Sequence, residues 1–348
     1  MCCCFTNNFL DSYMKVAIIG AGLAGLTAAN ILKDSVEITI FEKSRGVSGR
    51  MSTRYADPYY FDHGAQYFTA KFFEFKEFLK PMIDQGIIKN WQANFVEIKN
   101  SEIINQKSWD NEYKDYVGSP RMNAVAQYLA QGLDIYLNTR VGSITKEDRL
   151  WIVKDDNNQF LGCFDWIIFA IPSDQLKDLP PQNTSFYNHI SSIKMDSCFS
   201  LMLGYDKEIN LNFDAALVHD EIISWISLNS SKPDRNTPNC LVIHSANKWA
   251  NQYIDYDREQ ILETIFDRAK EVLTVDLNKP DYRTLHAWRY ANIGKQNTPG
   301  YFIDTNQNIS ACGDWCIKGR VESAFTSAYM LANQIKQISS TNSNINSY

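Results

Sequence analysis

The stretch Lys15-Val-Ala-Ile-Ile-Gly-Ala-Gly-Leu-Ala-Gly-Leu26 decides the fold of this 348-residue chain. Its apolar run, Val16 to Ile19, is typical of a buried parallel strand, and the residues after it are typical of a helix. Between the two, Gly20 permits a tight turn, Gly22 lets the backbone approach a pyrophosphate, and Gly25 lets the helix pack closely on the strand. The pattern therefore predicts a phosphate-binding turn at a helix N-terminus.

A second apolar run, Ile38-Thr-Ile-Phe41, ends at Glu42, which lies 22 residues after Gly20. A carboxylate at the end of the second strand of such a unit accepts hydrogen bonds from a ribose. A glycine pattern alone also occurs in ordinary turns, but here it occurs together with the two strands, the helix and the acid. These residues therefore predict a dinucleotide-binding unit.

The residues behind the second strand indicate which dinucleotide is bound. They read Lys43-Ser-Arg-Gly46-Val-Ser-Gly49-Arg50-Met-Ser-Thr53. A domain that binds a nicotinamide dinucleotide does not need this loop, whereas extended FAD needs small residues beside its diphosphate and ribityl chain. Arg50 can also pair with a phosphate through two hydrogen bonds. We therefore expect FAD rather than NAD.

A second contact region for FAD is expected near the other end of the chain. The apolar run from Asn308 ends in Gly313-Asp314, and small residues follow from Gly319 to Ala328. Asp314 is placed to accept hydrogen bonds from the ribityl hydroxyls. The start of the following helix would bring N–H groups and a positive dipole near flavin N1 and O2.

Four segments carry a resemblance to a known family. They are Gly20 to Arg50, Phe61-Asp-His-Gly-Ala-Gln-Tyr-Phe68, His286-Ala-Trp-Arg-Tyr-Ala291, and Gly313-Asp-Trp-Cys-Ile-Lys-Gly-Arg-Val-Glu322. With these segments the chain resembles the glutathione-reductase-type FAD proteins of the flavin amine oxidase superfamily, and within it the bacterial renalase-like enzymes. The first segment is common to many flavoproteins, whereas the second and third segments occur in far fewer families and are therefore more specific.

The resemblance implies an α/β fold and a set of FAD contacts. The implied fold is an FAD-binding Rossmann-like domain interleaved with an α+β substrate domain that is built on an antiparallel sheet. Gly64 and Ala65 would pass along the isoalloxazine ring, and the backbone of Val141 would face the adenine. The complete set of expected cofactor-binding residues is Gly20, Gly22, Leu23, Ala24, Gly25, Glu42, Lys43, Gly49, Arg50, Gly64, Ala65, Gln66, Val141, Ala170, Gly313, Asp314, Arg320, Val321, Glu322 and Ala324.

The sequence pattern favours interleaved domains over consecutive ones. We expect the FAD-binding domain to comprise residues 14–70, 131–172 and 301–337, with strands at Leu133–Val141, Arg149–Lys154 and Cys163–Ala170. A substrate-binding domain would comprise residues 71–130 and 173–300, where alternating segments favour an antiparallel sheet. Residues 1–13 are expected to be a non-folding extension, and the polar residues 338–348 a disordered tail.

Composition excludes several classes of function. A net charge of −6 argues against a nucleic-acid or anionic-membrane surface, and no apolar run approaches the roughly 18 residues that span a bilayer. The scattered cysteines indicate reduced thiols and a cytoplasmic location. Two alternatives stay open: lipid modification of the Cys2–Cys4 cluster, and a redox pair or metal site at Cys312 and Cys316. We favour buried neutral thiols at the latter and predict no metal.

Three residues are candidates for the substrate pocket. Strand-like alternation places Trp288 on one face with His286 and Tyr290, where it could present an aromatic wall to a flat substrate ring or form part of the core. Gln66 could reach the substrate or the flavin, and His244 could face the pocket or be a hydrogen-bonded core histidine. No cysteine lies between Cys240 and Cys312, where monoamine oxidases hold flavin covalently, so we expect non-covalent FAD.

Three hypotheses for function follow. The resemblance implies an oxidase that transfers hydride from misreduced isomers of NAD(P)H to flavin N5, with dioxygen reoxidising the flavin to give hydrogen peroxide. The first alternative is an oxidase of primary or secondary amines, for which Lys295 would be a candidate lysine. The second alternative is a flavin-binding protein without turnover. No catalytic residue is assigned, because the flavin performs the chemistry, and the oligomeric state is left open.

Overall fold

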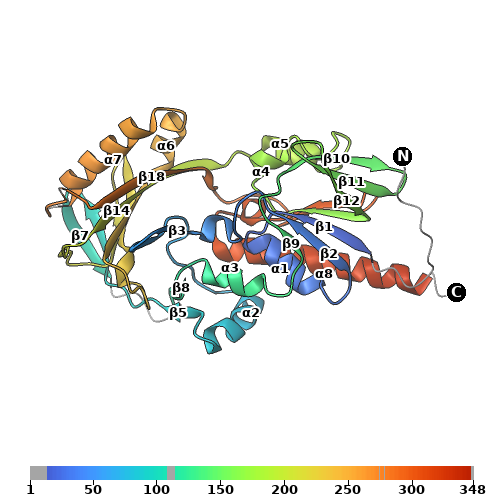
Figure 1. Cartoon of the computed structure of the whole chain (residues 1–348), viewed down its shortest axis with the longest axis horizontal. Coiled ribbons are helices and arrows are strands. Elements are labelled where there is room, and N and C mark those ends of the chain that lie inside the picture. The colour runs from blue at the N-terminus through green and yellow to red at the C-terminus, as the bar shows by residue number, and fades with distance from the viewer. Residues whose placement is uncertain (1–13, 108–113, 274, 278, 346–348) are drawn as a thin grey trace.

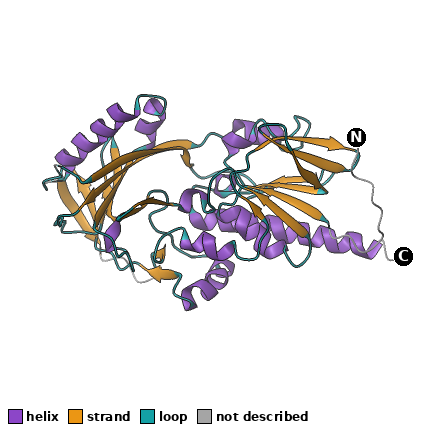
Figure 2. Ribbon diagram, viewed as in Figure 1, coloured by secondary structure: helices purple, strands orange, loops and turns teal. Residues whose placement is uncertain are grey.

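The computed structural model describes residues 14–107, 114–273, 275–277 and 279–345. The expected extension, residues 1–13 with the Cys2–Cys4 cluster, lies outside these residues. Figure 1 shows an elongated molecule with two lobes, each built around its own β-sheet. Figure 2 shows that helices cover both lobes and that loops and strands connect them near the middle.

The first lobe contains a six-stranded sheet with the order β19-β20-β13-β1-β2-β9. All neighbouring strands are parallel except β19 and β20. The expected dinucleotide-binding unit is therefore confirmed as the centre of a parallel sheet. The strands are β1 (Lys15–Ile19), β2 (Glu37–Phe41), β9 (Ile135–Tyr136), β13 (Trp166–Phe169), β19 (Phe302–Asp304) and β20 (Ile309–Ala311).

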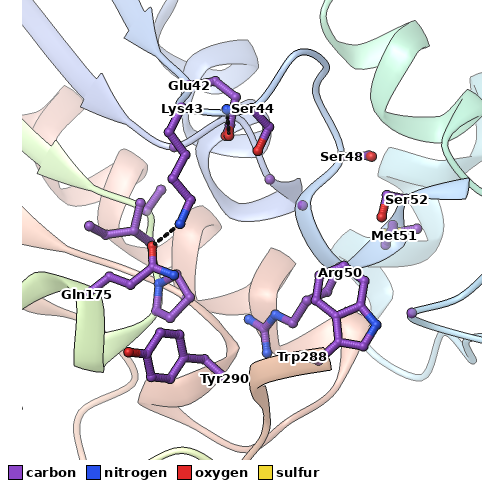
Figure 3. A pocket seen from close by; sticks show the side chains of 18 of the residues that line it. Glu42, Lys43, Ser44, Ser48, Arg50, Met51, Ser52, Gln175, Trp288 and Tyr290 are labelled. Atoms are coloured by element: carbon purple, nitrogen blue, oxygen red, sulfur yellow. Dashed lines mark hydrogen bonds between the residues drawn. The ribbon is translucent and has the colours of Figure 1, made fainter. Parts of the chain in front are cut away.

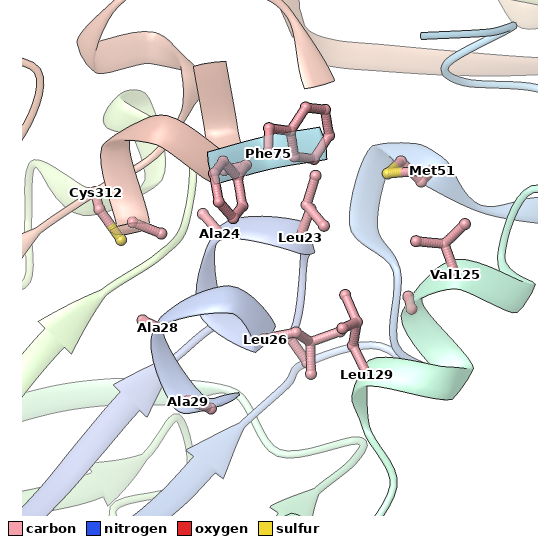
Figure 4. Packing of buried hydrophobic residues seen from close by; sticks show 14 of the residues in the cluster. Leu23, Ala24, Leu26, Ala28, Ala29, Met51, Phe75, Val125, Leu129 and Cys312 are labelled. Carbon is pink, nitrogen blue, oxygen red and sulfur yellow. The ribbon is translucent and has the colours of Figure 1, made fainter. Parts of the chain in front are cut away.

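Side chains of β1 alternate between two hydrophobic cores. Val16 and Ile18 pack with α1 (Leu23–Leu32) and α8 (Val321–Ile345), whereas Ala17 and Ile19 pack against a three-stranded sheet on the opposite face. Figure 4 shows the first of these cores, where α1 meets Phe75, Val125 and Leu129. The glycine turn is thus fixed by packing on both faces. The three-stranded sheet comprises β10 (Val141–Glu147), β11 (Leu150–Asp155) and β12 (Phe160–Phe164).

Two expected strands are wrong as single elements. Leu133–Val141 divides into β9 and β10, because Asn138 has a φ of +53° that turns the chain out of the first sheet. Cys163–Ala170 likewise divides into β12 and β13. There the backbone N–H of Asp165 donates to the carbonyl oxygen of Lys15 at 2.9 Å, and the Asp165 carboxylate accepts the N–H of Lys15 at 2.8 Å. In both cases a polar residue in an apolar run marks the change of sheet.

The second lobe is built on a seven-stranded sheet with the order β18-β14-β17-β16-β15-β6-β7. The expected antiparallel sheet is confirmed, apart from the parallel pair of β15 and β6. Helices α6 and α7 pack on one face of this sheet. Its elements are β6 (Phe95–Lys99), β7 (Glu102–Lys107), β14 (Asp196–Tyr205), β15 (Ala215–Val218), β16 (Ile223–Leu228), β17 (Asn239–Ser245), β18 (Tyr282–Asn292), α6 (Asn247–Tyr253) and α7 (Arg258–Val272).

A hairpin from the first segment of the chain crosses to the second lobe. Tyr59 and Phe61 of this hairpin are buried against Met202 and Val242 of the seven-stranded sheet. The hairpin therefore carries the end of β4 into the region between the lobes. Its strands are β3 (Thr53–Ala56) and β4 (Tyr59–Asp62); the remaining elements are η1 (Gly49–Met51), α2 (Phe73–Asp84), β5 (Ile88–Asn90), β8 (Tyr116–Gly118), α3 (Ala124–Leu129), α4 (Ser173–Leu176), α5 (Tyr187–Ser192), η2 (Asn229–Ser231) and η3 (Asp314–Cys316).

The expected disordered tail is wrong over residues 338–345, because α8 continues to Ile345. Leu331 and Ile335 are buried one turn apart and hold the helix on the first lobe. Adding residues to a helix that is already formed is much easier than starting one, so the polar residues extend it. Among the residues that the structure describes, no helix is both long and apolar enough to cross a membrane.

Candidate functional site

A cavity of about 1750 Å³ lies where the two lobes meet. The glycine turn, the loop behind β2 and the start of α8 form one side of it, and β17, β18 and the residues after β4 form the other. Figure 3 shows Lys43 and Gln175 at one end of this pocket, away from Arg50 and Trp288. The cavity therefore extends from the ends of the parallel strands to the seven-stranded sheet of the second lobe.

The glycine turn leaves space where a ligand could approach its backbone. Gly20 has a φ of +107°, and a methyl group on Gly25 would lie 2.0 Å from the carbonyl oxygen of Gly20. A methyl group on Gly22 would meet nothing within 4 Å. Gly22 is also the N-cap of α1, and no side chain caps that helix. The N–H groups of the first turn are therefore left for another partner, which suits an anion such as a pyrophosphate.

Glu42 ties the glycine turn to the loop behind β2. One carboxylate oxygen accepts the N–H of Ala21 at 2.9 Å, and the other accepts the N–H of Ser44 at 2.8 Å. Glu42 is buried but still lines the cavity. A carboxylate can accept about four hydrogen bonds, so two positions are left for the hydroxyls of a ribose.

Arg50 and Asp314 contact each other across the cavity wall. The guanidinium donates two hydrogen bonds to the carboxylate, at 2.9 Å and 2.5 Å, and a third to the carbonyl oxygen of Ala291 at 3.1 Å. The expected partner of Arg50 was a phosphate, and that of Asp314 was the ribityl chain. The structure instead joins the two expected FAD contacts in one ion pair that fixes the loop before β3 next to η3.

Lys43 lies at the opposite end of the cavity. Its ammonium donates a hydrogen bond to Gln175 at 3.0 Å (Figure 3). Burial, and then the charge of Arg140, lowers the pKa of Lys43. This end is therefore polar, and both Lys43 and Arg140 line it beside Glu42.

Most of the sequence-predicted site residues are brought together by the fold. All of them line this cavity except Gly25, Gln66 and Glu322. Gly25 lies behind the turn, where the close packing of α1 on β1 requires it. Whether the lining residues contact FAD stays a prediction.

Gln66 does not line the cavity, and its expected contact with the substrate or the flavin stays a prediction. Its amide nitrogen donates to the carbonyl oxygens of Asp62 at 2.5 Å and Gly64 at 3.0 Å. Its amide oxygen accepts the hydroxyl of Ser227 at 2.8 Å and the ammonium of Lys232 at 3.3 Å. These hydrogen bonds hold the side chain in place and stabilise the segment that carries Gly64.

Glu322 is engaged elsewhere in the fold, and its expected contact with FAD likewise stays a prediction. Its carboxylate accepts the backbone N–H groups of Lys71 and Phe72, at 2.5 Å and 2.7 Å. It thereby satisfies N–H groups at the start of α2, where a carboxylate is favourable. Glu322 holds α2 against α8 and does not line the cavity.

The side of the cavity formed by β17, β18 and the residues after β4 is lined by Trp288 and three histidines. The indole N–H of Trp288 donates to the carbonyl oxygen of His63 at 2.8 Å, and the two rings stack with centroids 5.0 Å apart. His286 meets Trp288 edge to face at 4.3 Å. His244 donates to the same carbonyl oxygen at 3.2 Å through Nε2, so its Nδ1 carries no proton in the neutral ring.

All three histidines are neutral at physiological pH. Burial, and then the neighbouring His286 and Arg54, lowers the pKa of His63 to about 3. Burial lowers the pKa of His244 to about 4, and burial together with Arg54 lowers that of His286 to about 4. The wall therefore presents aromatic surface and neutral imidazole nitrogens, of which Nδ1 of His63 is buried without a hydrogen-bond partner.

A buried ionic cluster supports this wall from behind. The Asp62 carboxylate pairs with Arg235 at 2.7 Å and with Lys232 at 3.3 Å, and all three side chains are fully buried. Burial alone would raise the pKa of Asp62, but the two cations hold it below its usual range. Burial outweighs the attraction of Asp62 and lowers the pKa of Lys232 to about 8. The cluster fixes the start of the segment from Asp62 to Gln66.

Sequence reasoning missed two groups of residues here. His63 lies within a motif that carried the resemblance, so its position was a usable signal. Lys232 and Arg235 follow Asp62 by more than 160 residues and lie in no motif, so nothing in the sequence indicated them. Cys312 and Cys316 are buried, and burial raises the pKa of both thiols, as expected for neutral thiols. Among the described residues, no cluster could hold a metal ion.

The site fits FAD on its own geometry. The open space at Gly22 and the uncapped start of α1 suit a diphosphate, and Glu42 suits the ribose beside it. Val141 lies near this end, and Asp314, Arg320 and the start of α8 line the cavity farther along. The residues that would hold an extended dinucleotide thus lie along a single cavity.

Comparison with known families supports this interpretation. The model of the flavin containing amine oxidoreductase family matches residues 85–336, and that of an NAD(P)-binding Rossmann-like domain matches residues 18–81. A curated relative, a 4,4'-diapophytoene desaturase of Staphylococcus aureus (strain Newman), is 50% identical over 52 residues. That match covers 15% of this chain and spans about a tenth of the desaturase.

Two solved structures share the fold over most of their length. One is a protein assigned as a protoporphyrinogen oxidase from Exiguobacterium sp. 255-15, with a TM-score of 0.75 and 10% identity over 95% of this chain and 100% of that chain. The other is a wild-type putrescine oxidase bound to putrescine, with a TM-score of 0.64 and 13% identity over 92% of this chain and 98% of that chain. At these identities the likeness establishes the fold alone.

Proposed function

The chain belongs to the flavin containing amine oxidoreductase family, and from this premise we propose that it is an FAD-dependent oxidase of dihydronicotinamides. The substrates would be misreduced isomers of NAD(P)H, as in renalase-type enzymes. When bound, FAD supplies a hydride acceptor that dioxygen can reoxidise, so that dihydronicotinamide, dioxygen and a proton give the nicotinamide cation and hydrogen peroxide.

The chemistry of the substrate-side wall carries this proposal. Trp288 offers a flat aromatic surface against which a dihydropyridine ring can stack. The neutral histidines around it add hydrogen-bond donors and acceptors without a charge. A dihydropyridine needs no base to lose hydride, because its ring nitrogen lone pair drives the loss. A wall of neutral rings is therefore sufficient for this substrate.

The same wall is a poor site for a protonated amine. Among the described residues that line the cavity, the only lysine is Lys43, which lies beside Glu42 at the far end. Lys295 is exposed and does not line the cavity. Of the lining carboxylates, Asp314 is already paired with Arg50, and Glu42 lies beside Lys43 at the far end. Trp288 and the histidines beside it offer an ammonium group no countercharge of their own. Oxidation of amines stays the alternative, supported by the family to which the chain belongs.

We further propose that FAD is bound without a covalent link. Cys198 is the only cysteine among the described residues that line the cavity. Burial raises the pKa of its thiol to about 12, so the thiol is protonated and is a weak nucleophile. Precipitation of the protein with acid should release all of the yellow colour into the supernatant. Colour that stays with the precipitate would contradict this proposal.

Anaerobic reduction of the bound flavin tests the proposed substrate. The purified holoprotein is mixed in separate experiments with base-isomerised NADH, fresh NADH and a panel of amines that includes putrescine. The proposal predicts rapid bleaching of the flavin by the isomer mixture and slow or no bleaching by the others. Admission of air should then restore the colour and give one hydrogen peroxide per substrate oxidised.

Each other outcome selects an alternative. Bleaching by amines alone would replace the proposal with an amine oxidase. Bound FAD that no compound bleaches would identify a flavin-binding protein without turnover. Equal bleaching by fresh NADH and by the isomer mixture would contradict the specificity for misreduced isomers.

A further inference from the structure

We propose that Arg54 forms an anion-binding subsite on the substrate side of the cavity and that it takes a phosphate or carboxylate group of the substrate. This inference rests on the proposed function for the identity of the reacting ring. The subsite itself depends only on the residues around Arg54. Such a subsite would distinguish anionic substrates from uncharged ones. The wall of neutral rings alone cannot make that distinction.

Arg54 is positioned by the hairpin that crosses between the lobes. It is the second residue of β3, and it pairs in register with Phe61 of β4, two residues before His63. It lines the same cavity as His63, His286 and Trp288. Its charge also contributes to the lowered pKa of both histidines.

Arg54 lines the cavity and has a buried guanidinium nitrogen without a protein partner. Arg50 is held by Asp314, Arg235 by Asp62, and Arg289 by Asp255. Within the described residues, the side chain of Arg54 makes no hydrogen bond or ion pair, and its Nε is buried with its donor unsatisfied. A buried donor on a charged group costs free energy unless a partner satisfies it. That partner is therefore expected from the ligand.

The surroundings of Arg54 select an anion. Its neighbours His63 and His286 are neutral, and the buried Nδ1 of His63 also lacks a partner. The nearby lining residues Tyr55 and Asn123 are polar but uncharged and bond to each other at 3.0 Å. A phosphate or carboxylate would supply the missing countercharge, and a guanidinium binds either group through two parallel hydrogen bonds.

Binding of simple anions to the holoprotein tests the subsite without turnover. Phosphate, pyrophosphate, acetate and nicotinate are titrated into the oxidised protein, with uncharged nicotinamide for comparison, and the flavin spectrum and tryptophan fluorescence are followed. The variants are Arg54→Gln, Arg54→Lys and a charge-matched control, Arg283→Gln. Arg283 lies on the same strand as Trp288 but pairs with Glu259 and Glu263 on the exposed surface.

The subsite predicts that anions bind to the wild type and to Arg283→Gln with the same affinity. Arg54→Gln should weaken their binding by about 10- to 100-fold, because a charge-assisted hydrogen bond is lost, and Arg54→Lys should weaken it less. Nicotinamide should bind all four proteins alike. Preference for phosphate and pyrophosphate would assign a nucleotide phosphate, and preference for nicotinate and acetate a ring carboxylate. Anion binding that is absent, or unchanged in Arg54→Gln, would overturn the subsite.

Steady-state kinetics with two substrates distinguish a failure of this inference from a failure of the proposed function. Misreduced dihydronicotinamide mononucleotide carries a phosphate, whereas the corresponding riboside does not. Arg54→Gln should lower kcat/KM for the mononucleotide by about 10- to 100-fold and leave that for the riboside within about twofold. Equal losses for both would overturn the subsite while the oxidase activity stands. Arg54-dependent anion binding with no bleaching by either compound would support the subsite and contradict the proposed substrate.

Chemical modification keeps the inference testable if the variants do not fold. Phenylglyoxal modifies arginines in the wild-type holoprotein, and mass spectrometry locates the modified residues. The subsite predicts that phosphate protects Arg54 from modification and leaves Arg283 unprotected. Equal modification of Arg54 with and without anions would overturn it.

Discussion

The guanidinium of Arg50 and the carboxylate of Asp314 form an ion pair with two hydrogen bonds, although the two residues are 264 positions apart in the sequence. The Asp314 side chain is 6% exposed and that of Arg50 is 28% exposed. The pair therefore joins the loop behind β2 to the turn after β20 in the wall of the cavity.

Breaking this pair from one side should destabilise the protein. Arg50→Gln leaves a buried carboxylate without its cation, and the free energy of unfolding should fall by about 2 kcal/mol or more. Chemical denaturation measures the change, and flavin absorbance per chain measures the accompanying loss of FAD. The double variant Arg50→Gln/Asp314→Asn is the control, because it removes both charges. The double variant should have a higher free energy of unfolding than Arg50→Gln. A still lower value would show that the loss in Arg50→Gln does not come from an unpaired Asp314 carboxylate.

The neutral histidines predict a loss of stability in mild acid. The pKa values of His63, His244 and His286 are lowered to about 3, 4 and 4, below the ordinary value of 6.5. Between pH 6.5 and about 4 the unfolded chain therefore binds more protons than the folded one, so stability falls as the pH falls through this window. The effect should be on the order of 1 kcal/mol per histidine at pH 5.

Urea denaturation at a series of pH values checks this dependence. Carboxylates that are paired in the folded state add their own loss at still lower pH, so the comparison is best made between pH 7 and pH 5. His244→Gln removes one of the titrating rings and should flatten the profile in this range. A wild-type profile that is already flat would show that the histidines are not held neutral by burial.

Trp288 should contribute to binding of the substrate ring through its aromatic face. Trp288→Leu removes the ring and should weaken binding of nicotinamide to the oxidised protein by up to about tenfold. Trp288→Phe keeps an aromatic surface but loses the hydrogen bond to His63, so it should bind within a few-fold of the wild type. Difference spectra of the flavin report both affinities. If Trp288→Leu binds as tightly as the wild type, Trp288 is a core residue only.

Much of the fold could be predicted because its signals are local. A strand, a glycine turn and a helix follow one another within Lys15 to Leu32, so periodicity and residue size suffice. The same is true of Gly313 and Asp314, which end one strand and precede one helix. These residues could be placed at the site without knowing any long-range contact.

The rest depends on contacts between distant residues. The direction of the Gln66 side chain is set by Ser227 and Lys232, and that of Glu322 by the N-terminus of α2. Periodicity within a short motif does not contain that information. The unpaired state of Arg54 is likewise a property of the whole cavity, since it depends on which carboxylates lie near.

Binding of FAD by a matched pair of glycine variants tests the central claim most directly. Gly22→Ala adds a methyl group to open space at a φ of −77°, so the fold should tolerate it, whereas Gly25→Ala would place the methyl group 2.0 Å from a backbone oxygen. The account predicts that the wild-type apoprotein takes up one FAD per chain. It also predicts that Gly22→Ala keeps its melting temperature but binds FAD at least about tenfold more weakly, and that Gly25→Ala melts at a lower temperature. A wild-type protein that takes up no FAD, or a Gly22→Ala variant that binds it unchanged, would contradict the account.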